Sequence, residues 1–536
     1  MANQDQTPQT PWYITTSIPY VNAQPHIGHA LEDVQADVLA RYHRLKREDV
    51  WFLTGTDENS LKNVRAAERE GISTQALVDR NAAQFRALRD SLDLSFDDFI
   101  RTSVDVRHAS GVQKLWEACD QNGDIYQRAY AGLYCVGCEQ FYAENELADG
   151  LCPEHLVAPE LVEEQNYFFR LSRYTDRLRE LIESDQLRIV PRTRKNEVLG
   201  FIRGGLADFS ISRSRARARG WGIPVPGDAE QVTYVWFDAL GNYITALGYA
   251  CDQAHYQRYW ARNPHRAHVI GKNIIRFHAI YWPAMLLSAG VLPPTDIFIH
   301  GFVTVDGRKV GKSLGNAIDP VALAERYGTD VLRYYLLREI PATGDGDFSP
   351  EHLVRAYNAD LADQLGNLLS RTVGMISRYY GGAVPTPGEL EEADLRLVAS
   401  GEQLYQRIDA ALEQFALDAA LGAIWDLVAL ANKYVVEVQP WALAKRRADP
   451  AIERRLATTL YNLVETLRLV THALCAFLPA TAEGIARQLG IALDTSDVLR
   501  DVLAWGRYRA GTAVQPGAVL FPKVDAVCVF TASVLS

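Results

Sequence analysis

Two short motifs, far apart in the chain, carry side chains that are suited to holding the phosphates of a nucleotide. The first is the segment Pro-His-Ile-Gly-His, residues 25–29. It is expected at the start of a helix, where unpaired backbone N–H groups and the helix dipole favour a phosphate. His26 and His29 are three residues apart and project from one face of the first turn, while Gly28 lets a nucleotide approach the backbone. The alternative is that both histidines only cap or pack the helix.

The second motif is the glycine-rich segment 306–316, which contains Lys309 and Lys312. Negative charge grows on a pyrophosphate leaving group when a nucleophile attacks an α-phosphate. Mobile ammonium groups that close on this charge stabilise the transition state more than the ground state, and lysine offers a point charge on a long stem. The catalytic residues predicted by the two motifs are His26, His29, Lys309 and Lys312.

Three cysteines and one histidine form a metal-binding pattern between these motifs. Cys135-x-x-Cys138 is followed by Cys152-Pro-Glu-His155. Three thiolates and one imidazole at this spacing predict a closed, tetrahedral zinc site. Because no ligand position is left open, we expect the zinc to be structural. Three coincidental thiols and a surface histidine are the alternative.

The elements that must position the first motif read as strand, helix and strand. Residues 12–18 and 50–54 are rich in β-branched and aromatic side chains and predict buried strands, and apolar residues at helical spacing lie between them. This order predicts a right-handed parallel crossover, the start of a doubly wound, Rossmann-type α/β sheet. Ligands bind such sheets beyond the carboxyl ends of the strands, where Tyr20, His26 and Asp57 would lie.

Composition changes divide the chain into segments. Further strand-like stretches occur at 232–237, 267–270 and 297–303, whereas the sequence from about 352 to 500 is rich in leucine and alanine at helical spacing. An all-α bundle is therefore expected after the α/β domain. The expected domains are the first half of the catalytic Rossmann domain (1–115), an insert with the zinc knuckle (116–226), the second half of the catalytic domain (227–325), a linker with the end of the lysine-loop module (326–360), the helical bundle (361–500) and a tail that packs back on the body (501–536).

The overall composition is that of a globular protein. The 536 residues are 48% hydrophobic and 23% charged, and the chain is too long for one core. No apolar run reaches the length of about 18 residues that predicts a membrane span. The net charge of −11 argues weakly against nucleic acid, although the basic clusters 192–195 and 213–219 either contact RNA or are simply solvated. The cysteines expected as free thiols of a reducing cytoplasm are Cys119, Cys251, Cys475 and Cys528.

Taken together, the two phosphate motifs resemble the HIGH and KMSKS motifs of class I aminoacyl-tRNA synthetases. Segments 232–243 (VTYVWFDALGNY) and 270–282 (IGKNIIRFHAIYW) resemble methionyl-tRNA synthetases in particular, and the cysteine pattern is similar to the single-zinc form of that family's insert. The insert is also too short for the large editing domain of the class I enzymes for leucine, isoleucine and valine. The resemblance covers residues 12–523. It implies ATP-dependent activation of L-methionine to methionyl-adenylate and its transfer to tRNA(Met).

The resemblance also implies three sets of binding residues. The ATP-binding set is His26, Gly28, His29, Gly271, Asn273, Lys309, Lys312 and Ser313. The methionine-binding set is Ile18, Tyr20, Asp57, Trp236, Ala239, Leu240, Tyr243, His278 and Trp282. The anticodon-binding set is Asn367, Arg371, Asn432, Pro440 and Trp441. An aromatic cage suits a thioether, a buried carboxylate suits the substrate ammonium, and an indole face can stack an unpaired base. Core aromatics, a turn aspartate and helix caps are the alternatives.

The chain departs from the family's pattern at three places. Val310 and Gly311 replace the middle residues of the lysine motif, segment 59–60 is Asn-Ser where the family usually has His-Gly, and Asn273 stands where aspartate is common. Both lysines are kept, so the chemistry is expected to be kept as well. The rate of loop closure and the affinity for the nucleotide are what these changes put in question.

Two other functions stay open on the sequence alone. One is a class I enzyme for another small apolar amino acid, and the other is a catalytically inactive tRNA-binding paralogue. On the main interpretation the substrates are L-methionine, ATP with Mg²⁺ and tRNA(Met), and one Zn²⁺ is structural. The chain ends at Ser536 without room for the C-terminal dimerisation domain of larger members, so a cytoplasmic monomer without a membrane partner is expected.

Overall fold

The structure is a computed structural model, and it describes residues 9–142, 144–153, 156–251, 253–310, 316–493 and 497–524. The chain divides into two compact units. Unit 1 comprises Met1–Pro25, Asp49–Asp90 and Ser95–His300. Unit 2 comprises His26–Glu48, Ser91–Leu94 and Gly301–Ser536.

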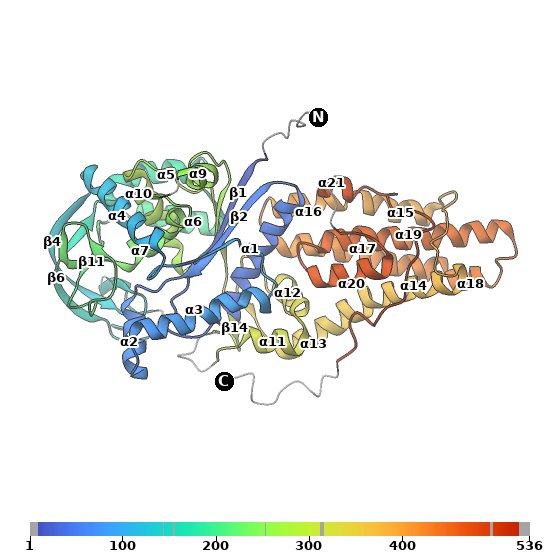
Figure 1. The fold of residues 1–536 in the computed structure, drawn as a ribbon, viewed down its shortest axis with the longest axis horizontal. Coiled ribbons are helices and arrows are strands. Elements are labelled where there is room, and N and C mark those ends of the chain that lie inside the picture. Colours follow the sequence, from blue (N-terminus) through green and yellow to red (C-terminus); the bar gives the residue numbers. More distant parts are fainter. Residues whose placement is uncertain are drawn as a thin grey trace. The chain divides into compact units, whose positions relative to one another are not determined.

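Unit 1 is built on a six-stranded parallel sheet with the order β3-β2-β1-β12-β13-β7. Figure 1 shows β1 and β2 in blue, next to each other. The strands are β1 (Pro11–Thr16), β2 (Asp49–Thr56), β3 (Asp98–Arg101), β7 (Arg188–Val190), β12 (Arg266–Gly271) and β13 (Asp296–His300). In the sheet, β3, β2, β1, β12 and β13 follow the 3-2-1-4-5 order of a Rossmann-type sheet, and β7 is added at the edge. The strand order reverses between β1 and β12. The predicted fold class is thereby confirmed.

The central strands are buried on both faces, as parallel strands usually are. All six residues of β12 are buried, as are the last four of β1. Both faces of such strands need apolar or internally bonded side chains. The β-branched and aromatic residues of segment 12–18 therefore correctly predicted a strand, which is β1. The switch point between β1 and β12 is where this type of sheet binds ligands.

Two smaller sheets complete unit 1. The first has the order β5-β4-β6-β8, and its long antiparallel pair of β4 and β6 is drawn in teal in Figure 1. Its strands are β4 (Ile125–Cys135), β5 (Gln140–Tyr142), β6 (Glu160–Phe169) and β8 (Phe209–Ser210). The second has the order β10-β11-β9, with β9 (Ser212–Ser214), β10 (Pro224–Val225) and β11 (Asp228–Thr233). The stretch 116–226 therefore contains the first of these sheets and strands β9 and β10 of the second, whose β11 lies beyond it, and it also supplies β7 to the parallel sheet.

Helices connect the strands of unit 1. They are α2 (Leu61–Glu70), α3 (Thr74–Ser91), α4 (Val106–Gln121), α5 (Thr175–Glu183), α6 (Arg192–Arg203), α7 (Val235–Leu240), α8 (Asn242–Thr245), α9 (Gln253–Tyr256) and α10 (Trp282–Ser288). A π-helical turn, η5 (Phe277–Tyr281), leads directly into α10. Such turns are rare and are frequently found at functional sites.

Two of the predicted strands were wrong in part. The segment 232–237 is a strand only to Thr233, and α7 begins at Val235. All six residues of α7 are buried, so its sequence lacks the polar face that distinguishes a helix from a strand. The segment 297–303 is also interrupted, because β13 ends at His300 and a separate strand, β14, begins at Val303.

Unit 2 begins with α1 (Ile27–Leu45), continues through a small sheet and ends in a helical bundle. The sheet has the order β15-β14-β16, with β14 (Val303–Val305), β15 (Arg308–Lys309) and β16 (Gly346–Asp347). Its first helices are α11 (Pro320–Tyr327), α12 (Thr329–Arg338), α13 (Pro350–Ala356) and the π-helical η7 (Tyr357–Gly366). The later helices are α14 (Asn367–Tyr380), α15 (Glu392–Glu402), α16 (Leu404–Leu412), α17 (Leu417–Val438), α18 (Pro440–Ala444), α19 (Pro450–Leu474), α20 (Pro479–Leu489) and α21 (Leu499–Val502).

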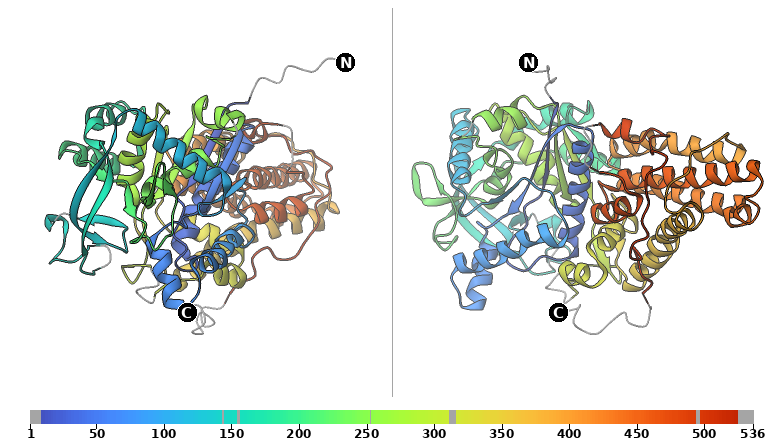
Figure 2. Two further views of the ribbon diagram at one scale, coloured as in Figure 1. Left: turned by 60° about the vertical axis from the view of Figure 1, so that its left-hand side comes forward. Right: turned by 45° about the vertical axis from the view of Figure 1, so that its right-hand side comes forward.

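The bundle is organised around its long helices. α14, α17 and α19 pack side by side, and the right-hand view of Figure 2 shows the long orange and red helices of the bundle. The helical stretch 417–444 is long and apolar enough to cross a membrane by length and composition, but 56% of its most apolar window is buried inside the protein, as the core of a bundle requires. The tail packs back onto this unit: the Tyr357 hydroxyl donates to the carbonyl oxygen of Pro522 at 2.6 Å.

Candidate active site

The histidine motif forms the first turn of α1. His26 is the N-cap residue with an extended backbone, and its Nδ1 accepts a hydrogen bond from the N–H of Gly28 at 3.1 Å. His29 Nδ1 accepts in turn from the N–H of His26 at 3.0 Å, and the two rings stack with centroids 3.8 Å apart. The two imidazoles therefore form a reciprocal capping box.

This capping does not exclude a role in binding phosphate. In a neutral imidazole, a nitrogen that accepts a hydrogen bond leaves the proton on the other nitrogen. Since Nδ1 of both rings accepts, Nε2 carries the proton and is a donor. A Cβ at position 28 would lie only 3.0 Å from Cε1 of His26, which explains why glycine stands between the two rings.

The lysine motif begins on a β-hairpin of unit 2. Lys309 lies at the exposed end of β15, and its Nζ is 4.0 Å from the centre of the Phe302 ring. Val310, which replaces the family's methionine, is buried, and its N–H donates to the carbonyl oxygen of Val303 at 3.3 Å. Lys312 and Ser313 lie outside the described residues.

The first turn of α1 and the segment that follows the lysine motif are in direct contact. The N–H of Ile27 donates to the carbonyl oxygen of Ile318 at 3.0 Å, and α1 also contacts β14. The histidines and Lys309 thus belong to neighbouring elements of one unit. The predicted two-sided phosphate clamp would draw on both of these elements.

The residues of the predicted methionine set lie in unit 1, around the switch point of the parallel sheet. Ile18 and Tyr20 follow β1, and Asp57 follows β2. A β-bridge joins Tyr20 and Asp57, and the N–H of Asp57 donates to the carbonyl oxygen of Pro19 at 2.9 Å. Residues from the ends of two neighbouring strands are thereby held together.

Aromatic rings from α7, α8, η5 and α10 complete this cluster. Trp236 stacks on Phe277 at a centroid distance of 3.6 Å and meets Tyr20 edge to face at 6.4 Å. The Tyr243 ring lies 5.7 Å from His278 and 6.0 Å from Trp282. Ala239 and Leu240 are buried beside them on α7. All members of the predicted set are thus found around the carboxyl ends of β1 and β2 or on these helices.

His278 has a defined tautomer when its ring is neutral. Its Nδ1 donates to the carbonyl oxygen of Ile274 at 3.0 Å, so Nε2 accepts from the Tyr243 hydroxyl at 2.8 Å. His268 lies behind it, stacked on Tyr243 at 4.0 Å. Burial, followed by the nearby His278 and Arg266, holds the pKa of His268 well below its usual value. His268 is therefore neutral at neutral pH, like the tyrosine and tryptophan rings around it.

Asp57 is the exception, because it brings a carboxyl group into this buried cluster. It is 2% exposed, and its Oδ1 has no hydrogen-bond partner among the described residues. Burial, followed by the neighbouring charges of Asp238 and Glu139, raises its pKa well above the usual range. The Tyr20 hydroxyl and Trp236 Nε1 also lack a partner within the described part of the chain. Buried polar atoms usually have a partner, so these three atoms make the cluster a candidate binding site for a polar group.

Gly271 and Asn273 lie at the end of β12, on the other side of the switch point. A Cβ at position 271 would approach Oδ1 of Asn273 to 3.0 Å and Cε1 of His300 to 3.6 Å. The glycine therefore permits two polar side chains to lie close over the end of the strand. His300, at the end of β13, was not predicted as a site residue.

Sequence reasoning missed a buried polar network beside Asp57. Asp238 on α7 accepts hydrogen bonds from Asn59 at 2.8 Å and pairs with His108 at 2.6 Å. Ser60 caps α2 by accepting from the N–H of Asn63 at 3.2 Å. The departures at 59 and 60 from the family's usual residues thus have defined structural partners. No local sequence signal joins His108 to Asp238, because they are distant in the chain.

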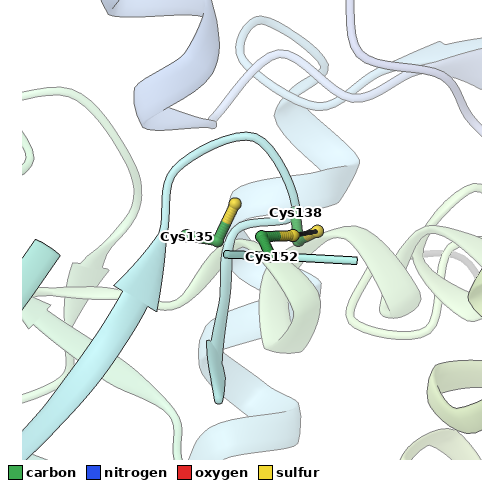
Figure 3. Close-up of side chains that lie close together, drawn as sticks. All are labelled: Cys135, Cys138 and Cys152. Carbon is green, nitrogen blue, oxygen red and sulfur yellow. Dashed lines mark hydrogen bonds between the residues drawn. The ribbon is translucent and has the colours of Figure 1, made fainter. Parts of the chain in front are cut away.

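The three cysteines of the predicted metal site come together in unit 1. Cys135 ends β4, Cys138 precedes β5 and Cys152 follows in a turn, and their sulfur atoms lie within 4.8 Å of one another. Figure 3 shows the three side chains converging, with the sulfurs of Cys138 and Cys152 3.4 Å apart. Tetrahedral zinc with bonds of about 2.3 Å places its sulfur ligands about 3.8 Å apart. The cluster fits zinc, and His155 lies outside the described residues.

The basic clusters are mainly structural. Arg213 is buried, and its guanidinium carbon lies 4.2 Å from the centre of the Tyr234 ring and 4.8 Å from that of Phe141. Arg194 pairs with Glu197 at 2.5 Å, and Lys195 pairs with Asp185 at 2.7 Å. These contacts favour the interpretation as internal and surface structure over contact with RNA.

Two of the predicted anticodon residues meet in unit 2. The guanidinium of Arg371 on α14 lies 5.5 Å from the centre of the Trp441 ring, which is 38% exposed and follows the buried Pro440 at the start of α18. Asn367 is exposed at the start of α14. Asn432 on α17 is turned toward η7, donating to the carbonyl oxygen of Gln364 at 3.2 Å. An exposed indole with a cation beside it is suited to stacking a nucleobase.

Family comparisons match nearly the whole chain. The family described as "tRNA synthetases class I (M)" matches residues 12–160 and 155–373. The family described as "Anticodon binding domain of methionyl tRNA ligase" matches residues 384–528. These two matches cover the cysteine cluster, both phosphate motifs and the helical bundle.

Individual relatives agree with the family matches. Methionine--tRNA ligase of Clostridium acetobutylicum is 46% identical over 516 residues, which are 96% of this chain and 78% of the relative. The Brucella suis enzyme is 47% identical over 502 residues, covering 92% of this chain and 95% of the relative. The structure of Mycobacterium tuberculosis methionyl-tRNA synthetase in complex with methionyl-adenylate matches with a TM-score of 0.91 and 44% identity, covering 96% of this chain and 100% of that one. The chain therefore belongs to the methionyl-tRNA synthetase family.

Proposed function

We propose how the residues of this chain divide the work of methionine--tRNA ligation, the activity of its family. In the first step a carboxylate oxygen of L-methionine attacks the α-phosphorus of Mg-ATP. The bond to the bridging oxygen of pyrophosphate breaks, which gives methionyl-adenylate and pyrophosphate. In the second step a ribose hydroxyl at the 3′ end of tRNA(Met) attacks the methionyl carbonyl carbon and releases AMP. No covalent bond to the protein forms.

The phosphate chemistry is assigned to unit 2. His26 and His29 donate from Nε2 to phosphate oxygens at the start of α1, where the helix dipole adds to the attraction. Lys309 and Lys312 neutralise the charge that grows on pyrophosphate, and Ser313 donates a hydrogen bond beside them. Because the groups act on charge that appears in the transition state, they raise the rate rather than only the affinity. Gly271 and Asn273 of unit 1 are assigned to the nucleoside part of ATP.

Recognition of methionine is assigned to unit 1, and Asp57 carries this proposal. A buried carboxylate oxygen without a partner among the described residues is what the substrate ammonium requires. Neutral aromatic groups suit the polarizable sulfur, and they are Tyr20, Trp236, Tyr243, His278 and Trp282. Ile18, Ala239 and Leu240 line the apolar side chain. An aromatic and apolar lining around the side chain would favour methionine over charged amino acids, because burying an unpaired charge is costly.

The zinc is assigned a structural role. Cys135, Cys138, Cys152 and His155 would hold it as four protein ligands, which leaves no position for a substrate. The metal would tie together the turns at the end of β4 and near Cys152. The tRNA partner is recognised through the exposed pair of Arg371 and Trp441, with Asn367 and Asn432 beside them. We further propose that the chain acts as a monomer in the cytoplasm.

The test is ATP–pyrophosphate exchange with methionine, leucine, isoleucine and valine in parallel reactions. We expect exchange with methionine at a kcat/KM at least about 100-fold above the others, because an aromatic cage around the thioether discriminates by several contacts. Exchange that is strongest with another apolar amino acid would assign the chain to a different substrate. A Lys312→Ala variant should lose adenylate formation by orders of magnitude while it keeps tRNA binding. A wild-type chain that binds tRNA(Met) but shows no exchange with any of the four amino acids would favour the inactive, tRNA-binding paralogue.

A further inference from the structure

Asp238 is a fully buried carboxylate on α7, within the segment that carries the aromatic residues of the methionine cluster. It is 0% exposed and lies between Trp236 and Ala239 in the chain. Placing a charge in such a position is costly unless it is paired and hydrogen-bonded. Its partners therefore indicate what the charge is used for.

Each oxygen of Asp238 has a partner from a different element. Oδ1 pairs with Nε2 of His108 on α4 at 2.6 Å, and Oδ2 accepts from Nδ2 of Asn59 at 2.8 Å. His108 is itself 0% exposed, and its Nδ1 is 2.8 Å from the hydroxyl oxygen of Thr245. One carboxylate thus joins α7, α4 and the segment between β2 and α2.

The Asn59 end of this network reaches the backbone that carries Asp57. Asn59 also donates to the carbonyl oxygen of Thr102 at 3.2 Å. The side chain of Asn63 donates to the carbonyl oxygens of Asp57 and Glu58, each at 3.0 Å. Several hydrogen bonds therefore hold the segment between β2 and α2. Among them, the bond from Asn59 to Asp238 is the one that reaches α7, the helix that carries Trp236.

Asp57 and Asp238 have different kinds of contact. Both oxygens of Asp238 are engaged by the protein, whereas Oδ1 of Asp57 has no partner within the described residues. An engaged carboxylate cannot bind an ammonium without losing a bond to the protein. Asp57 is consequently the group that meets the ligand, and Asp238 is a fixed anchor.

We propose that the chain Asn59–Asp238–His108 is a positioning network that sets the distance between Asp57 and the aromatic cluster, and thereby the affinity for an amino acid with a free ammonium group. The inference rests on the proposed role of Asp57 in methionine binding. Asn59, Asp238 and His108 do not touch the substrate. They fix two groups that do: the carboxylate on the β2 side and the rings on α7.

The experiment compares two ligands that differ only in the amine, L-methionine and 4-(methylthio)butanoate. Their inhibition or dissociation constants are measured on the full chain and on the variants Asn59→Leu and Asp238→Asn. Asn59→Leu removes the donor but leaves the pair of His108 and Asp238. We expect affinity for L-methionine to fall about tenfold, as for the weakening of one hydrogen bond to a charged group, and affinity for 4-(methylthio)butanoate to change less than about twofold, since it makes no such bond. The KM for ATP should stay unchanged.

A conservative replacement and a matched control separate positioning from general damage. Asn59→His keeps a donor toward Asp238 and should restore most of the affinity for L-methionine. Asp124→Asn changes another fully buried carboxylate of unit 1, which is bonded to Tyr174, Ser288 and Arg173. It should affect thermal stability without selecting between the two ligands.

Two results would overturn the network, and they differ from failure of the proposed function. Equal losses for both ligands in Asn59→Leu would mean that the network only supports the fold of the cluster. Unchanged affinity for L-methionine in both variants would mean that Asp57 is positioned without it. If the wild-type chain itself shows no exchange with methionine, the assigned function fails instead.

Discussion

The N–H of Ile27 donates a hydrogen bond to the carbonyl oxygen of Ile318 at 3.0 Å. The first N–H groups of a helix have no partner within the helix, so the start of α1 obtains one from the chain that follows the lysine motif. The start of the histidine turn is thus bonded to the segment that follows the lysine motif in the chain. A substitution that moves Ile318 should therefore shift the histidine turn, one half of the proposed phosphate clamp.

Gly28→Ala tests how closely the histidine turn is packed. The added Cβ would lie 3.0 Å from Cε1 and 3.1 Å from Nδ1 of His26, so the capping ring must shift. We expect kcat for ATP–pyrophosphate exchange to fall about 10- to 100-fold, as for the misplacement of a catalytic group, and thermal stability to change by less than about 1 kcal/mol because alanine is the better helix former. An unchanged kcat would show that the ring position is not critical.

Asp57→Asn should weaken methionine binding and raise the free energy of unfolding of the unliganded protein. Loss of the carboxylate should raise the KM for methionine by about 100-fold, since a hydrogen bond to a charged group contributes about 1.5–3 kcal/mol. The unliganded protein should become more stable at neutral pH by about 1–3 kcal/mol, because a buried charge beside Asp238 and Glu139 is removed. Exchange kinetics and urea unfolding measure the two effects. A destabilised variant with unchanged KM would contradict both.

The difference in unfolding free energy between the wild-type protein and Asp57→Asn should depend on pH in a definite direction. The pKa of Asp57 is raised by burial and by the neighbouring charges of Asp238 and Glu139. A group whose pKa is raised on folding adds stability below its unfolded pKa and loses that contribution as the pH rises through the folded pKa. Wild-type protein without methionine should therefore lose stability relative to Asp57→Asn as the pH rises from about 4 toward neutrality. Saturating methionine should reduce this loss.

Removal of zinc should loosen the site through Glu139, the residue after Cys138. Its Oε1 accepts from the N–H of Lys62 at 2.9 Å at the start of α2, and its side chain also bonds to the Tyr134 hydroxyl. We expect about one zinc per chain by elemental analysis, and its loss in Cys152→Ser. Faster proteolysis of the knuckle and a several-fold higher KM for methionine should accompany the loss. Cys251→Ser, an exposed thiol outside the cluster, is the matched control.

Trp441→Ala should separate tRNA recognition from amino acid activation. Stacking on an aromatic ring contributes about 1–3 kcal/mol per base, so kcat/KM for tRNA should fall about 5- to 150-fold while exchange without tRNA stays the same. Val436→Ala, at a 60% exposed position on α17, should have little effect on either assay. Equal losses in both assays for Trp441→Ala would point to damage to the fold.

Arg333 forms a buried ion pair that unites α1 with the bundle side of unit 2. Its Nη2 lies 2.8 Å from Oδ2 of Asp37, both side chains are fully buried, and its Nε donates to the carbonyl oxygen of Phe477 at 2.8 Å. Arg333→Met leaves Asp37 buried with one partner fewer and should cost about 3–5 kcal/mol of unfolding free energy. The double variant with Asp37→Leu should be less destabilised than the sum of the single variants. Additive losses would rule out the pairing.

Patterns local in sequence predicted much of this molecule. The two histidines at helix spacing, the lysines in a glycine-rich segment and the paired cysteines each lie within a few residues of one another, so their chemistry is visible in the sequence. The strand, helix and strand order at the start of the chain also predicted the type of sheet, because parallel crossovers have few alternatives.

What the sequence could not predict depends on contacts between distant segments. Asp238 finds His108 and Asn59 only after folding, and no spacing rule joins them. The segment 235–237 has aromatic and β-branched residues that favour a strand, yet it lies in the fully buried helix α7 because tertiary packing decides such short apolar runs. For the basic segment 213–219 the sequence left RNA contact and a solvated face both open, whereas Arg213 is enclosed by aromatic rings.

That enclosure separates two ways of anchoring a cation in unit 1. The guanidinium of Arg213 faces the rings of Tyr134, Phe141 and Tyr234 and forms no direct ion pair with any described residue. Exposed pairs such as Arg65 with Glu160 weaken in concentrated salt, because mobile ions screen them. The contacts of Arg213 with aromatic rings involve no partner ion that salt could replace. The sheet that carries the cysteines should therefore keep these contacts at salt concentrations that weaken the exposed ion pairs.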